Sequence, residues 1–176
     1  HLSVLVEDDA AVLALSSSRL SLDRGAASLP GTSSLAVAGN ASLEAGGGLV
    51  LDAAGDVSAT GSIGVRDGVL SLGAAQVSIG QTDSQSIEGG LVFSNADLGA
   101  VAGGDLRLRS RGLIDIYGDL ADPTSGAPLD FGTLTLDAQG IRGLANGDTT
   151  TVLAAETIRL GNSSGGTAAD AGTAAQ

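Results

Sequence analysis

From residue 68 to residue 80 the chain reads Gly-Val-Leu-Ser-Leu-Gly-Ala-Ala-Gln-Val-Ser-Ile-Gly, which contains two aliphatic doublets that begin seven residues apart. Each doublet has one small or polar residue between two aliphatic ones, and this alternation predicts a short strand with one buried face. The pattern recurs at Leu13–Leu15, Leu20–Leu22, Leu35–Val37, Leu49–Leu51, Leu106–Leu108, Ile114–Ile116, Leu134–Leu136 and Ile158–Leu160.

The spacing of the doublets indicates a repeat architecture. Neighbouring doublets often begin seven residues apart, and the longer step from Leu49 to Leu70 is three times that unit. A chain wound into a coil with about three short strands per turn has this periodicity. We therefore predict an all-β solenoid, a parallel β-helix of about seven coils with loop insertions.

Composition agrees with a narrow stack of thin layers. The 176 residues include one Tyr, two Phe, no Trp and no Met, so a core must be built from Leu, Val, Ile and Ala. The 28 glycines fall mainly between the doublets, where a chain that turns every few residues needs unusual backbone angles. The apolar spacing does not fit helices of ordinary length.

The predicted organisation is a β-helical shaft over residues 1–161 and a loop or frayed end over 162–176, which is rich in Gly, Ala, Ser and Thr. Residues 1–22 have the pattern of continuing coils. The polar stretch 81–90 and the stretch 119–132, which holds Pro123 and Pro128, are expected to leave the ladder as surface loops.

Charge and residue usage exclude several classes of partner and site. The formal net charge of −12 disfavours nucleic acid and anionic membrane surfaces as partners. Without Cys there is no disulfide framework or thiolate metal site, and no stretch has the pattern of a membrane span. The fragment Gly103-Gly104-Asp105 is too short for a tandem calcium-binding repeat, so we predict no metal and no cofactor.

Particular strings resemble a known family. These are Leu49-Val50-Leu51-Asp52-Ala53-Ala54-Gly55-Asp56-Val57, the stretch 68–80, Leu134-Thr135-Leu136-Asp137-Ala138-Gln139-Gly140-Ile141 and residues 153–162. They resemble the degenerate repeats of filamentous-haemagglutinin-like exoproteins, the large passengers of two-partner secretion. The resemblance covers most of residues 35–162, but the family's N-terminal secretion signature is missing, so we expect an interior shaft segment of a longer chain.

The resemblance implies a right-handed parallel β-helix in a secreted or cell-surface bacterial protein. It implies a role in adhesion, aggregation, biofilm or contact-dependent competition, with an effector carried elsewhere on the parent chain. The implied partners are a host or bacterial surface receptor or glycan and, for the parent chain, an outer-membrane transporter.

Three alternating arginines are the candidate binding residues: Arg107, Arg109 and Arg111. A period of two places them on one outward face while Leu106 and Leu108 point inward. In an acidic protein such a face could bind a carboxylate-bearing or sulfated glycan. The alternative, which we favour, is that these arginines pair with aspartates on adjacent coils, such as Asp115, Asp130 or Asp137.

Catalysis is not predicted. The single histidine is His1 and there is no Cys, so no serine or cysteine nucleophile has a base to activate it. The alternative function is a polysaccharide lyase or hydrolase of the parallel β-helix type that acts through surface aspartates. Its candidates are Asp115, Asp119 and Asp137, and they would have to converge in a groove.

Overall fold

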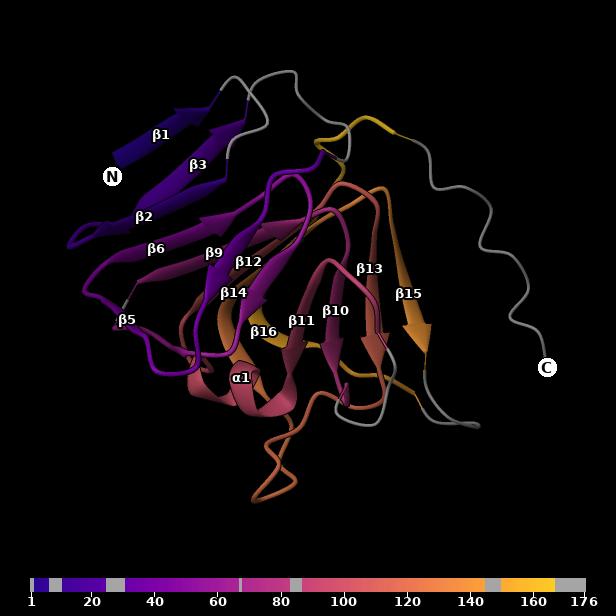
Figure 1. Ribbon diagram of the computed structural model, residues 1–176. Coiled ribbons are helices and arrows are strands. Elements are labelled where there is room, and N and C mark those ends of the chain that lie inside the picture. Colours follow the sequence, from indigo (N-terminus) through magenta and orange to yellow (C-terminus); the bar gives the residue numbers. More distant parts are fainter. Residues whose placement is uncertain are drawn as a thin grey trace.

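A computed structural model (Figure 1) describes residues 2–6, 11–24, 31–66, 68–82, 87–144 and 150–166. The chain is mostly β, with one short helix, α1 (Asn95–Ala100), in the described part. The strands are β1 (Leu2–Val6), β2 (Val12–Ser16), β3 (Leu20–Arg24), β4 (Leu35–Val37), β5 (Ser42–Ala45), β6 (Gly48–Asp52), β7 (Val57–Ala59), β8 (Ser62–Val65), β9 (Val69–Ala74), β10 (Val77–Gly80), β11 (Leu91–Ser94), β12 (Asp105–Ser110), β13 (Leu113–Tyr117), β14 (Asp130–Asp137), β15 (Gly140–Leu144) and β16 (Ala154–Gly161).

Two six-stranded sheets account for most of these strands in the described residues. The first sheet has the order β16-β14-β12-β9-β6-β2 and the second has the order β15-β13-β10-β11-β7-β4. The chain passes between them repeatedly, as in β6 to β7, β9 to β10, β12 to β13 and β14 to β15 (Figure 1). Two further parallel pairs, β1 with β3 and β5 with β8, lie at the N-terminal end.

The strands of the first sheet are in register, so their inward residues form continuous rows. One row is Leu15, Leu49, Leu70, Leu106, Leu134 and Ile158, and the next is Leu13, Leu51, Leu72, Leu108, Leu136 and Leu160. The interior members are buried in one cluster with Val57, Val77, Ile79, Phe93 and Ile114 from the second sheet. The predicted strands and the inward position of Leu106 and Leu108 are therefore confirmed. On the two outermost strands the prediction of a buried face is wrong, because no further strand of the described residues covers them: Leu13 and Leu15 of β2 are 50% and 47% exposed, and Ile158 and Leu160 of β16 are 45% and 70% exposed.

The second sheet contains a strand out of sequence order. Strand β11 lies between β7 and β10, parallel to both, although it follows β10 in the chain. The stretch 81–90, predicted to be an insertion, is thus the connection from β10 to β11, which places β11 between β10 and β7. Residues 83–86 within it lie outside the described residues.

The N-terminal prediction of continuing coils is wrong for β2. This strand runs antiparallel to β6, whereas β6, β9, β12, β14 and β16 are parallel. The described part of the first sheet therefore stacks five parallel strands, fewer than the seven or so coils expected. The alternation of aliphatic residues is the same in both directions, so it could not reveal the reversal.

The second predicted insertion, 119–132, is a loop as expected over most of its length, but its last three residues belong to the ladder as the start of β14. The loop spans residues 118–129, is closed by an antiparallel bridge between Ala121 and Pro128, and gives way to β14 at Asp130. At the other boundary, β16 ends at Gly161 and the described residues 162–166 form an exposed turn, while 167–176 lie outside the described residues. No helix in the described part is long and apolar enough to span a membrane.

Candidate functional site

The structure separates the three predicted arginines. Arg107 and Arg109 alternate with the buried leucines of β12 and therefore share the outward side of the first sheet. Arg111 follows the end of β12 and is only 1% exposed. The prediction of three guanidinium groups on one open face is therefore wrong for Arg111 and also for Arg109, which is only 7% exposed.

Arg109 and Arg111 belong to a buried network of opposite charges. The register places Asp52, Gly73, Arg109 and Asp137 side by side on consecutive strands. Arg111 Nη2 donates to Asp52 Oδ1 at 2.9 Å, and its Nη1 donates to the carbonyl of Ala53. Gly73 leaves the room that this network needs, since a Cβ there would lie 1.9 Å from Asp52 Oδ2.

Asp137 connects the network to the surface arginine. Its carboxylate lies 3.8 Å from Arg107 Nη2 and accepts hydrogen bonds from the backbone N–H and the hydroxyl of Ser163, at 2.7 Å and 2.6 Å. Burial lowers the pKa of Arg109, and the charges of Asp52 and Asp137 oppose that shift. Pairing with aspartates on adjacent strands is thus confirmed for Asp137, and Asp52 is a partner that the sequence did not identify.

Arg107 also lines a groove with two arginines that sequence reasoning missed. This arginine groove, about 290 Å³, lies on the outward side of the first sheet and includes Arg19, Ser71, Asp105, Arg107, Thr135 and Arg159. Asp105 pairs with Arg19 and accepts the N–H of Thr133 at 2.8 Å. Arg107, Thr135 and Arg159 form one register row, so the two arginines are two strands, roughly 10 Å, apart.

A signal for Arg159 was present in the sequence. Arg107 and Arg159 are both the middle residue of an aliphatic doublet, Leu106–Leu108 and Ile158–Leu160, and a middle residue faces outward. Arg19 had no such signal, because it precedes β3 and reaches Asp105 across a large distance in sequence.

The three candidate catalytic aspartates do not converge. Asp115, on β13 in the second sheet, is 1% exposed and accepts from Arg142 Nε and Nη2 at 2.7 Å and 2.8 Å and from Gln76 Nε2 at 2.8 Å. Its hydrogen bonds raise the pKa of Arg142. Asp137 lies in the first sheet, and Asp119 is exposed in the loop after β13. No cluster of three potential metal ligands occurs among the described residues.

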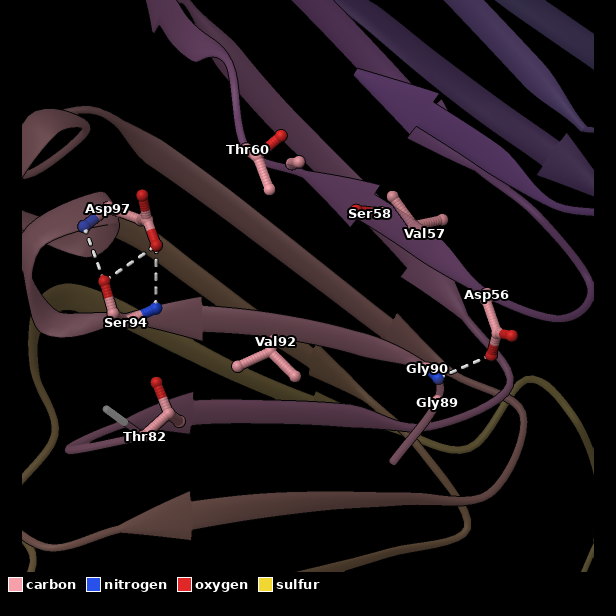
Figure 2. Close-up of a pocket in the computed structure, with 11 residues that line it drawn as sticks. Asp56, Val57, Ser58, Thr60, Thr82, Gly89, Gly90, Val92, Ser94 and Asp97 are labelled. Atoms are coloured by element: carbon pink, nitrogen blue, oxygen red, sulfur yellow. Dashed lines mark hydrogen bonds between the residues drawn. The ribbon is translucent and has the colours of Figure 1, made fainter. Parts of the chain in front are cut away.

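A second groove, about 440 Å³, opens on the second sheet where β7 and β11 meet (Figure 2). We call it the β7–β11 groove, and it is lined by Asp56, Val57, Ser58, Ala59, Thr60, Thr82, Gly89, Gly90, Val92, Ser94 and Asp97. Asp56 Oδ1 accepts the N–H of Gly90 at 2.6 Å at one end, and Asp97 lies at the other. The sequence does not predict this groove, because the groove depends on the out-of-order position of β11.

Comparisons with known proteins give no relative. Searches of protein-family models, of curated proteins and of solved structures return no significant match to this chain.

Proposed function

We propose that this chain is a structural and adhesive shaft segment of a large secreted bacterial surface exoprotein of the filamentous-haemagglutinin-like kind, with the fold of a right-handed parallel β-helix. The observation that carries the proposal is the pair of in-register aliphatic rows across β6, β9, β12, β14 and β16. Each added layer buries the same side chains, so such a stack lengthens without needing a new core.

The position of the acids favours a shaft over a polysaccharide enzyme. Asp115 and Asp137 lie in different sheets, and each is buried against its own partners. A glycosidase needs two carboxyl groups on either side of one scissile bond, one of them free to exchange a proton. Neither aspartate meets that requirement, and we propose no catalytic activity.

The adhesive contact in this proposal is the arginine groove. Arg159 is exposed, and Arg107 is about one-third exposed. Guanidinium groups recognise carboxylate and sulfate groups through paired N–H donors. Two such groups set roughly 10 Å apart along the sheet suit a linear glycan that carries repeated acidic groups.

Retention on a sulfated-polysaccharide resin tests the adhesive part. We expect Arg159→Ser to elute at clearly lower salt than the unchanged protein, because one groove contact is lost. Arg66→Ser is the matched control: Arg66 is also exposed, lies after β8 and is outside the groove. Equal shifts for the two variants, or no retention of the unchanged protein, would contradict an anion-binding groove.

Labelling of intact cells tests the surface location separately. An antibody raised against the exposed loop residues 123–128 should bind intact cells that make the parent protein. Binding only after the cells are lysed would contradict the proposed location, whatever the resin shows.

A further inference from the structure

The second sheet is split between β7 and β11. Strand β7 pairs with β4 along its whole length, and β11 pairs with β10 along its whole length. Between β7 and β11, however, the ladder has a single pair, Leu91 with Val57. The next inward pair in that register, Phe93 with Ala59, does not form. The β7–β11 groove begins where this ladder ends.

The start of α1 explains why the ladder ends. The backbone N–H of Ser94 donates to Asp97 Oδ2 at 2.9 Å, and its hydroxyl donates to the same oxygen at 2.7 Å. The N–H of Asp97 returns a bond to Ser94 Oγ at 3.3 Å, which completes a capping box. The N–H of Ser94 is therefore bonded to the cap of the helix, and it does not donate to β7 to continue the ladder.

The split leaves the backbone N–H and C=O of Ala59, on β7, facing the groove. The N–H of Val57 donates to the carbonyl of Gly90 on the β11 side, and the N–H of Thr60 donates to Val37 on the β4 side. Successive residues of a strand direct their backbone groups to opposite edges, so those of Ala59 are directed to the β11 side. There the ladder offers them no partner.

Side chains around the gap give it a defined chemistry (Figure 2). Val92 is 38% exposed and lies across the gap from Val57 and Ser58. The hydroxyl-bearing residues Ser58, Thr60, Thr82 and Ser94 line its sides. Asp56 and Asp97 stand at opposite ends, and no ion pair to a described basic side chain involves either of them.

We propose that the β7–β11 groove binds an extended peptide segment of a partner protein that carries a lysine or arginine. Its backbone would supply the donor and acceptor that Ala59 lacks, as in other cases of strand addition to an open sheet edge. Its basic side chain would lie against Asp97 or Asp56, and its aliphatic part would cover Val92. This is an activity separate from the shaft and from the arginine groove.

A titration with short synthetic peptides tests the proposal. The probes are Ac-Ser-Val-Lys-Val-Ser-amide, the same peptide with Glu in place of Lys, and the same peptide with Pro in place of the second Val. We expect the lysine peptide to shift the NMR signal of the Ala59 amide and slow its hydrogen exchange. The glutamate and proline peptides should bind at least tenfold more weakly. The glutamate side chain meets the like charges of Asp56 and Asp97, and the proline peptide lacks one backbone N–H.

A pair of variants locates the binding. Val92→Trp should fill the groove and weaken the lysine peptide at least tenfold, and Val152→Trp, at a side chain 58% exposed outside the groove, should leave affinity unchanged. Unchanged melting temperatures show that both variants are folded. The proposal is overturned if the lysine and glutamate peptides bind alike, if both variants lose binding equally, or if only a neutral oligosaccharide such as cellohexaose shifts the Ala59 signal.

Discussion

At the scale of single residues, the buried ion pair between Asp52 and Arg111 is the feature that most separates this chain from a purely aliphatic stack. Both side chains are almost completely inaccessible to water. Taking one charge away leaves the other in a medium that solvates it poorly. Arg111 is therefore a structural residue of this fold, and the outward face is left with Arg107 as its partly exposed member of the original three.

Replacing Arg111 by Met should destabilise the protein by about 3–5 kcal/mol, because the substitution removes the guanidinium group that donates to Asp52 Oδ1 and leaves a buried carboxylate with less compensating charge. Arg159→Met is the control. Arg159 is exposed, and a surface change of this kind is expected to stay within about 0.5 kcal/mol. Chemical denaturation followed by circular dichroism measures both, and equal midpoints for the two variants would show that the buried pair has no stabilising role.

What the sequence predicts at this scale depends on how far a contact reaches along the chain. The outward position of Arg107 follows from alternation within one strand, and it is confirmed, whereas Arg109 is buried at 7% exposure although it follows the same alternation. The pairing of Arg111 with Asp52 joins the residue that follows β12 to the last residue of β6, across the intervening strand β9. It depends on the register of both ladders, and alternation within each strand does not fix that register.

At the scale of elements, the position of a leucine within its aliphatic row decides how strongly its replacement lowers the stability of the fold. Leu72 is fully buried in the middle of its row, while Leu160 in the same row is 70% exposed on the edge strand β16. The same substitution at the two positions therefore compares an interior layer with an outer one.

Leu72→Asp should unfold the layers formed by β6, β9 and β12, because an unpaired carboxylate has no partner among the leucines of its row. We expect a melting temperature lower by many degrees, or no cooperative melt. Leu160→Asp should change it little. A melt of Leu72→Asp that matches that of Leu160→Asp would contradict the inward assignment of β9.

The loop between β13 and β14 has its own pH dependence. Asp122 Oδ1 accepts the N–H groups of Ser125 and Thr124, at 2.7 Å and 2.9 Å, and the hydroxyl of Ser125 at 2.9 Å. The bonds from Ser125, and then that from Thr124, lower the pKa of Asp122 below its ordinary value of 3.8. Since the folded pKa is the lower one, these bonds favour the closed loop above pH 3.8, and that contribution is lost as pH falls through the folded pKa.

We expect the amide signals of Thr124 and Ser125 to move together in an NMR pH titration, with a midpoint below 3.8, while amides of β9 stay unchanged over the same range. Asp122→Asn should reproduce the low-pH signals at neutral pH. A midpoint at or above 3.8 would mean that the turn does not hold the carboxylate in its charged form.

At the scale of the whole molecule, the sequence predicted the strands better than their order. Each aliphatic doublet lies within a strand, because the inward face of each layer requires aliphatic residues at every second position. The antiparallel β2 and the displaced β11 were not predicted, since neither changes that alternation. The β7–β11 groove follows from the displacement of β11, so the sequence could not predict it either. In the arginine groove, Arg107 and Arg159 could be found as the middle residues of their doublets, whereas Arg19 could not.

The stacking of successive strands is best tested by the separation of spin labels on outward residues. The chain has no Cys, so Arg107→Cys with Arg159→Cys gives two unique labels. Strands β12, β14 and β16 in register place these positions roughly 10 Å apart, and we predict strong dipolar broadening of the electron paramagnetic resonance spectrum. A pair at Arg107 and Thr124, the latter exposed in the loop, should give much less, although it is closer in sequence. No broadening for the first pair, or greater broadening for the second, would contradict the parallel stack.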